Sequence, residues 1–267
     1  MRHISLRGRR YAYDEAGSGP GLLLFHGWSG AADNFTSWLP ALAPHFRVVM
    51  PDLPGCAGAP TLDEPHTAAA YARFGRDLAT TLELGAHAVG GLCSGASIAM
   101  AYAAAYPDAT TALLLHTPFI HPGVIRRRMR VQLRALASPA GRVYGMLRRS
   151  ETLSRLYRRF TDGGGVATAE EERNSRNLER ADPRAARELA GDILRGDHRA
   201  LLREWTRPLF VIVAASDAFV MEARLRTDLL RLAPGARVVV LEGGHGWTPA
   251  YIERQAAALA AAARELG

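Results

Sequence analysis

The run Gly91-Leu92-Cys93-Ser94-Gly95 constrains the fold of this chain more than any other feature. Residues 86–90, before it, are typical of a short buried strand, and residues 94–106, after it, have the small and apolar composition of a buried helix. A strand that runs straight into a helix needs a sharp turn, and glycines on both sides of the apex permit one. We therefore expect Cys93 at the edge of a sheet, beside a helix N-terminus, where the helix dipole favours a thiolate.

The same five residues also have a purely structural explanation. Glycines and a buried cysteine occur together in many cores, and Cys93 would then be a small hydrophobic residue at a strand–helix junction. Ser94 is a rival nucleophile, but it lies one residue past the apex and is expected to turn into the helix. Other parts of the chain must separate these alternatives.

Strand-like and helix-like segments alternate over most of the sequence, which predicts an α/β fold with a mostly parallel central sheet and helices on both faces. The strand-like segments are residues 3–7, 9–14, 21–25, 47–50, 112–115, 208–213 and 237–241, and the helix-like segments are 34–42, 67–84 and 257–266. Residues 121–206 break the alternation: they are rich in arginine and typical of several short helices. We predict a core of residues 1–120 and 207–267, with residues 121–206 inserted as a helical lid.

Two more polar residues follow predicted strands at their carboxyl ends. Asp217 comes shortly after segment 208–213, and His245 comes shortly after segment 237–241. This is the sheet edge at which open α/β sheets bind ligands. In a triad, His245 would take the proton of the Cys93 thiol and return it to the leaving group, and Asp217 would orient the imidazole. Alone, Asp217 would be an ordinary loop or capping residue, but nothing structural requires imidazole at His245.

With the order nucleophile, acid, histidine, the chain resembles the α/β-hydrolase-fold enzymes over essentially its whole length. His26-Gly27 resembles the oxyanion-loop motif of that family, residues 51–55 resemble the loop after its next strand, and the insertion resembles its variable lid. The resemblance implies an oxyanion hole made by the backbone N–H groups of Trp28 and Ser94.

Three positions depart from the family pattern. Residues 55–58 read Gly-Cys-Ala-Gly where Gly-His-Gly is usual, Met221 replaces a usual proline, and Cys93 replaces the usual serine. Only the cysteine at position 93 changes the expected chemistry, because an acyl-cysteine is a thioester and stays activated for transfer. Cysteine at this position resembles the thioesterase-like enzymes of polyketide and peptide assembly, the polyester synthases and the dienelactone hydrolases, although this chain is shorter than the polyester synthases.

The sequence predicts an acyl-transfer enzyme with an acyl-Cys93 intermediate, a thioesterase or acyltransferase acting on a small-molecule acyl substrate. The acceptor, water or a second substrate, stays open. One alternative is a serine hydrolase in which cysteine was introduced experimentally, and another is a non-catalytic ligand-binding homologue. Candidate acyl-pocket residues in and near the insertion, which otherwise form its own core, are Phe119, Met129, Leu133, Tyr144, Met146 and Tyr157.

Charge and composition limit the classes of partner that the chain is expected to bind. The chain has 267 residues, a net charge of +7 and no lysine, so all 33 of its basic residues are arginine, many of them between Arg126 and Arg159. Complete use of arginine is typical of a GC-rich genome, but this cluster would also suit an acidic acyl or peptidyl carrier protein or coenzyme A. No nucleic-acid motif, membrane span, secretory signal or metal-ligand pattern is apparent, so we expect a cytoplasmic protein without nucleic-acid partners, metal or cofactor.

Overall fold

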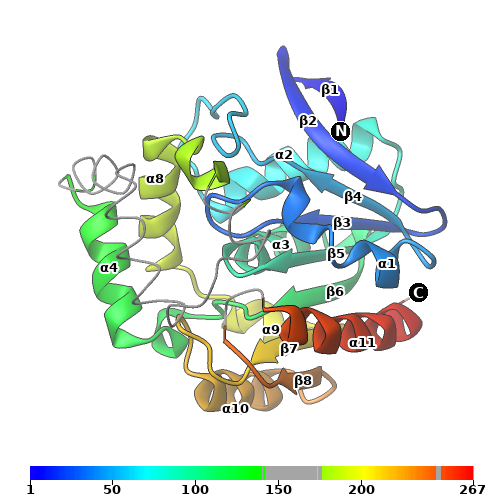
Figure 1. Cartoon of the computed structure of the whole chain (residues 1–267), viewed down its shortest axis with the longest axis vertical. Helices are drawn as coiled ribbons and strands as arrows, with labels where there is room; N and C mark the ends of the chain where they lie inside the picture. The colour runs from blue at the N-terminus through cyan, green and yellow to red at the C-terminus, as the bar shows by residue number, and fades with distance from the viewer. Residues whose placement is uncertain (140, 142–172, 174–175, 245–247, 267) are drawn as a thin grey trace.

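The computed structural model describes residues 1–139, 141, 173, 176–244 and 248–266, and their strands form one eight-stranded sheet (Figure 1). The strand order is β1-β2-β4-β3-β5-β6-β7-β8. β2 is antiparallel to β1 and to β4, and all other neighbours are parallel. The strands are β1 (Arg2–Leu6), β2 (Arg9–Ala16), β3 (Gly21–Phe25), β4 (Arg47–Pro51), β5 (His87–Leu92), β6 (Thr110–His116), β7 (Leu209–Ala214) and β8 (Arg237–Leu241).

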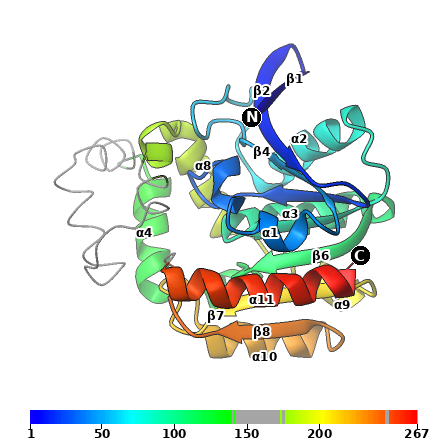
Figure 2. The same ribbon diagram turned by 45° about the vertical axis from the view of Figure 1, so that its right-hand side comes forward.

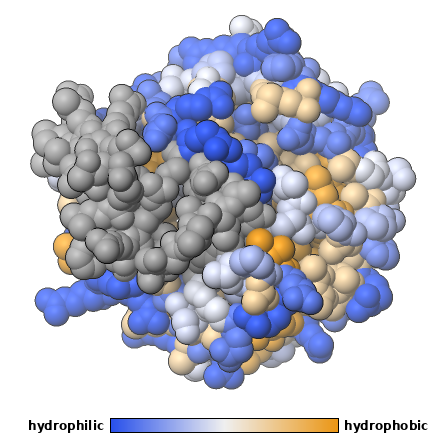
Figure 3. All heavy atoms as spheres, viewed as in Figure 1, coloured by the Kyte–Doolittle hydropathy of each residue, from blue (hydrophilic) through white to orange (hydrophobic). Residues whose placement is uncertain are grey.

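Helices cover both faces of the sheet. α2, α3, α9 and α10 form one layer, and α1 and α11 pack together on the other face, where α11 lies along β6, β7 and β8 (Figure 2). The helices are α1 (Leu39–Leu42), α2 (Ala68–Thr81), α3 (Ser94–Ala105), α4 (Arg127–Ala137), α8 (Pro183–Ile193), α9 (Arg199–Glu204), α10 (Glu222–Leu232) and α11 (Pro249–Leu266). Hydrophilic residues dominate the margins of the face in Figure 3, and alanine-rich α11 gives a paler orange area.

The central strands are mostly apolar because both of their faces are covered. All five residues of β3 and all six of β5 are buried. α3 is buried on almost every side between the sheet and α2, which explains its unbroken run of small and apolar residues. The predicted α/β fold is therefore confirmed.

Most predicted elements are confirmed within a few residues, and three differ. Residues 34–42 were expected as one helix, but they lie in a 3₁₀ turn (Ala32–Phe35) and the four-residue α1, because Pro40 cannot continue a helix from the preceding turn. α11 begins at Pro249, eight residues earlier than predicted, with proline in its first turn. α10 was missed, although Leu225, Leu229 and Leu232 have helical spacing and are buried.

The described part of residues 121–206, the predicted insertion, is joined to the rest of the chain by polar contacts. The Asp182 N–H donates to the Gly55 carbonyl at 2.8 Å, and the Ala68 N–H, at the start of α2, donates to Asp192 at 2.7 Å. His66 donates to Glu188 from its backbone N–H and from Nδ1, both at 2.9 Å. α4 packs on α8, whereas α9 packs on α3 and α10 in the layer beside the sheet.

Candidate active site

Cys93 lies at the apex between β5 and α3, as the sequence predicts. Its backbone has φ +57° and ψ −114°, a conformation that side-chain-bearing residues adopt only when their surroundings impose it. Its N–H donates to the carbonyl of His116, the last residue of β6, at 2.9 Å. α3 begins at the next residue, so the thiol lies beside the N-terminus of a twelve-residue helix.

The two glycines of the motif are required by backbone packing. A Cβ added at Gly91 would come within 2.2 Å of the Gly95 carbonyl group, and one added at Gly95 would lie 1.9 Å from the Phe25 oxygen. No side chain fits at such distances. Glycine is therefore required at both positions of the Gly-x-Cys-x-Gly motif, because α3 crosses very close to the ends of β3 and β5.

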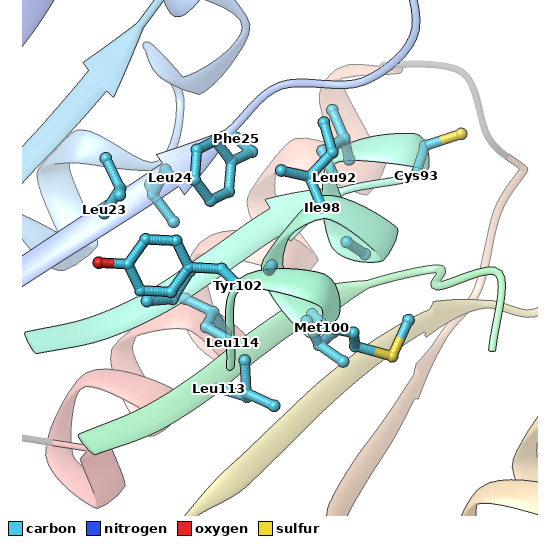
Figure 4. Packing of buried hydrophobic residues seen from close by; sticks show 14 of the residues in the cluster. Leu23, Leu24, Phe25, Leu92, Cys93, Ile98, Met100, Tyr102, Leu113 and Leu114 are labelled. Atoms are coloured by element: carbon cyan, nitrogen blue, oxygen red, sulfur yellow. The ribbon is translucent and has the colours of Figure 1, made fainter. Parts of the chain in front are cut away.

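The side chains of Cys93 and Ser94 differ in direction. Figure 4 shows the Cys93 sulfur pointing away from the labelled core side chains, including Phe25 and Ile98. Ser94 is 1% exposed, and its hydroxyl has no hydrogen-bond partner among the described residues. Ser94 is the first residue of α3, as the sequence predicts.

The loop after β3 runs directly against the apex. A Cβ added at Gly27 would lie 3.5 Å from Cys93 Cβ and 3.3 Å from the Leu92 carbonyl oxygen, so glycine permits this approach. Trp28 follows, half-buried, and its indole Nε1 has no hydrogen-bond partner among the described residues. Gly27, the residue before Trp28, thus lies against the candidate nucleophile, and the role of the Trp28 N–H in an oxyanion hole stays a prediction.

His26 fixes this loop and is not a candidate base. Nε2 accepts from the Leu53 N–H at 3.0 Å, so Nδ1 carries the proton and donates to the Gly27 carbonyl at 2.8 Å. Burial lowers the pKa of His26 to about 4, against the opposing effect of the Gly27 bond, so the imidazole is neutral at pH 7. Nearby Asp52 accepts from the Ala32 N–H at 2.8 Å and supports the same region.

Asp217 follows β7 and is 1% exposed. Its Oδ1 accepts from the N–H groups of Phe219 at 2.7 Å and Val220 at 2.8 Å, which folds residues 217–220 into a tight turn around the carboxylate. A buried carboxylate with this support keeps one orientation.

Ile125 and Arg126, among the first residues of the predicted insertion, hold that turn in place. Ile125 pairs with Val220 in an antiparallel bridge, and the Arg126 N–H donates to the Phe219 carbonyl at 2.8 Å. The Arg126 guanidinium Nε lies 2.8 Å from the Asp217 carbonyl oxygen and 2.9 Å from that of Val220. Arg126 therefore holds the acid turn and is not free for a partner protein.

His245 lies outside the described residues, so its position relative to Asp217 stays a prediction. The chain leading to it is described: the Gly243 carbonyl accepts from the Ser216 N–H at 2.9 Å. The loop after β8 is thereby joined to the residue that precedes Asp217.

The candidate acyl-pocket residues divide in two. Phe119, Met129 and Leu133 are 5%, 7% and 1% exposed and belong to the main hydrophobic cluster. Tyr144, Met146 and Tyr157 lie outside the described residues. A role of any of them in substrate binding stays a prediction.

Two residues near the apex had no signal in the sequence. His116 and Tyr251 are both 1% exposed, and His116 Nε2 lies 2.7 Å from the Tyr251 hydroxyl. The sequence left His116 as an ordinary strand residue and Tyr251 unremarked, because only the fold brings positions 135 residues apart together.

Known proteins agree with this architecture. A family model described as "Alpha/beta hydrolase family" matches residues 22–262. The proteins Rv2715 of Mycobacterium tuberculosis and Mb2734 of Mycobacterium bovis are each 31% identical over 144 residues, 53% of this chain. The match covers 40% of the length of those relatives.

Solved structures have the same fold over nearly the whole chain. A thermophilic esterase from Thermogutta terrifontis is 22% identical, with a TM-score of 0.76 over 100% of this chain and 99% of that one. The N-acyl homoserine lactonase AidH is 20% identical, with a TM-score of 0.78 over 99% of this chain and 96% of that one.

The protein belongs to the alpha/beta hydrolase family, and the resemblance seen in its sequence is confirmed. An eight-stranded, mostly parallel sheet and a sharp strand–turn–helix apex at Cys93 are the main features of its fold. Within the described ranges, no helix combines the length and hydrophobicity that a membrane crossing requires.

Proposed function

We propose that this hydrolase transfers acyl groups through a thioester on Cys93, with His245 as general base and acid and Asp217 as the residue that orients it. The observation that carries the proposal is the strained backbone of Cys93, at φ +57° beside the N-terminus of α3. Strain of this kind persists where a side chain must be presented in one direction, and a cysteine serving only as core filler does not need it.

The chemistry follows from the groups around the apex. The Cys93 thiolate attacks the acyl carbonyl, and the N–H groups of Ser94 and Trp28 stabilise the resulting oxyanion. The C–S or C–O bond to the leaving group breaks, and His245 delivers to that group the proton taken from the thiol. Water or a second substrate then attacks the acyl-Cys93 thioester while His245 takes its proton, and the C–S bond breaks with departure of the Cys93 thiolate, to which His245 returns the proton.

A thioester donor suits a cysteine nucleophile, because exchanging one thioester for another is close to neutral in free energy. The exposed arginines of α4, among them Arg127 and Arg134, support an acidic carrier protein or coenzyme A as the donor, because their positive charge attracts an acidic partner. Arg126 is used by the acid turn, and Arg128 lies 3.4 Å from the Ala218 carbonyl. The inserted residues 121–206 would form the lid over the acyl group.

Intact-protein mass spectrometry after mixing with a panel of acyl thioesters tests the nucleophile. We expect a transient adduct of acyl mass on the wild type and none on Cys93→Ala. Its lifetime with added amines, alcohols or water alone separates a transferase from a thioesterase. An adduct on both proteins, or neither adduct nor turnover with any donor, would contradict the proposal and favour a ligand-binding role.

The carrier is tested separately with Arg127→Gln/Arg134→Gln. We expect the KM for a carrier-bound donor to rise about fivefold at low salt and the KM for a small thioester to stay unchanged. Arg10→Gln is the matched control, because Arg10 is exposed on β2, far from α4 (Figure 1). Equal KM values for the carrier in all three proteins would remove α4 as its docking face.

A further inference from the structure

A buried tyrosine–histidine pair lies directly beneath the candidate nucleophile. The His116 carbonyl accepts the Cys93 N–H at 2.9 Å, while its imidazole Nε2 lies 2.7 Å from the Tyr251 hydroxyl. The two rings are perpendicular, with centroids 6.0 Å apart. One residue thus contacts the apex through its backbone and Tyr251 through its side chain.

Tyr251, in the first turns of α11, also contacts the loop after β8. Its ring packs on Gly243, where an added Cβ would come within 2.8 Å of Cδ2 and where φ is +129°. Gly243 in turn accepts the Ser216 N–H, one residue before Asp217. Tyr251 therefore connects the apex, the loop after β8 and the acid turn.

The charges around the phenol keep it a hydrogen-bonding group. Burial and the nearby Asp217 carboxylate raise the pKa of Tyr251, and Arg254 on α11 opposes them. His116 from β6 also faces the phenol, through the hydrogen bond to its Nε2. The hydroxyl stays protonated through the whole range in which the enzyme would act.

We propose that Tyr251 and His116 are positioning residues, whose hydrogen bond holds the Cys93 apex in register with the acid turn of Asp217. The inference rests on the proposed acyl-Cys93 chemistry. A displacement of about 1 Å between reacting groups costs about 100-fold in rate, so a bond that fixes two loops relative to one another acts on kcat.

The chain contains a matched control pair. The Tyr102 hydroxyl lies 3.0 Å from His87 Nε2, and both residues are buried. His87 is the first residue of β5, whereas Cys93 follows its last, so this pair lies at the opposite edge of the sheet. Tyr102→Phe removes the same kind of hydrogen bond without touching the catalytic edge.

The experiment compares Tyr251→Phe with Tyr102→Phe. We expect similar small losses in Tm, but a 10- to 100-fold drop in kcat with KM within twofold only for Tyr251→Phe. We also expect Tyr251→Phe to slow alkylation of Cys93 at pH 7 relative to the wild type and to Tyr102→Phe. His116→Gln keeps a hydrogen-bonding amide and should retain most of kcat.

Equal kcat and equal alkylation rates in the two tyrosine variants would overturn the inference. The alkylation assay needs no acyl substrate. If the wild type forms no acyl adduct at all, the proposed function fails, while the difference in alkylation rate between the variants still decides whether Tyr251 positions Cys93.

Discussion

The two cysteines of the chain differ in their backbone far more than in their exposure. Cys93 is 7% exposed and Cys56 is 6% exposed, and each has glycines nearby in the sequence. Cys93 is itself held at φ +57° at a helix N-terminus, whereas Cys56 has no positive φ of its own and lies in a turn, with its N–H donating to the Leu53 carbonyl at 2.8 Å. A short cysteine–glycine pattern therefore does not by itself distinguish a nucleophilic cysteine from one that only packs in the hydrophobic core.

The surroundings of Cys56 disfavour its thiolate. Burial raises the pKa of Cys56 to about 12, and Asp52 and Asp182 act in the same direction. The structural explanation considered for Cys93, a small hydrophobic cysteine beside glycines, describes Cys56 instead. What distinguishes Cys93 is the element on each side of it: a buried parallel strand before and a helix after.

Replacing each cysteine in turn tests the comparison most directly. Cys93→Ala should reduce turnover of any acyl substrate by at least about 1,000-fold, because a triad without its nucleophile retains only the contribution of binding and the oxyanion hole. Cys56→Ala should leave kcat within about twofold. Steady-state kinetics on both variants is the measurement, and comparable losses would show that Cys56 shares the chemistry.

Alkylation measures the same contrast without a substrate. At pH 7.5 a thiol with a pKa of about 12 is ionised to only a few parts in 100,000, so Cys56 should react slowly. We expect iodoacetamide to label Cys93 at least about 100 times faster than Cys56. Peptide mapping of a time course gives both rates in one sample, and equal rates would remove the special status of Cys93.

Backbone packing at the apex is tested with Gly95→Ala. The added Cβ would lie 1.9 Å from the Phe25 oxygen, so either α3 or β3 must move. We expect a loss of about 3 kcal/mol or more in the free energy of unfolding. Gly235→Ala is the control, because no atom lies within 4 Å of its added Cβ, and urea titration of both variants should separate them clearly.

Sequence patterns were sufficient for the elements that their own residues determine. The β3 and β8 boundaries match the prediction residue for residue, because an apolar run between turn residues marks a strand, whether it is buried throughout, as β3 is, or largely half-buried and exposed, as β8 is. The apex was predictable for the same reason, since strand, glycines and helix follow one another in the chain. Asp217 was located from its strand alone.

Other parts depend on contacts between distant segments. Tyr251 meets His116, and Arg126 meets the Asp217 turn, across 135 and 91 residues respectively. Neither pair is marked by a local sequence pattern. The sequence therefore placed Arg126 in the arginine cluster suited to a carrier protein, whereas in the structure its side chain contacts the Asp217 turn. α10 is different: its leucine spacing was visible, and the prediction overlooked it.

Acid should weaken the region that joins the two cysteines. His26 accepts from Leu53, whose carbonyl receives the Cys56 N–H, and donates to Gly27, which lies against Cys93. Its pKa is about 4 in the folded protein and 6.5 as the ordinary value, so the unfolded chain binds a proton first as pH falls. Protonation linked to His26 therefore leaves the free energy of unfolding unchanged above pH 6.5. By pH 4 it lowers that free energy by about 3 kcal/mol.

The variant His26→Gln isolates this effect, because glutamine does not titrate and retains a donor and an acceptor. Burial also lowers the pKa values of His87 and His198, so these residues too reduce the free energy of unfolding as pH falls. Burial raises the pKa of Asp52, which has the opposite effect. All three residues remain in the variant, so their contributions are the same in both proteins. We expect unfolding free energies from urea titrations to fall less steeply between pH 6.5 and 4 for His26→Gln. In the wild type at pH 5, a dipyridyl disulfide should then reach Cys56 faster than in the variant, because the opened loop binds a proton at His26 and opening therefore costs less free energy. Parallel pH curves and equal labelling of Cys56 would show that the two cysteine environments are stabilised independently, and that His26 does not join them.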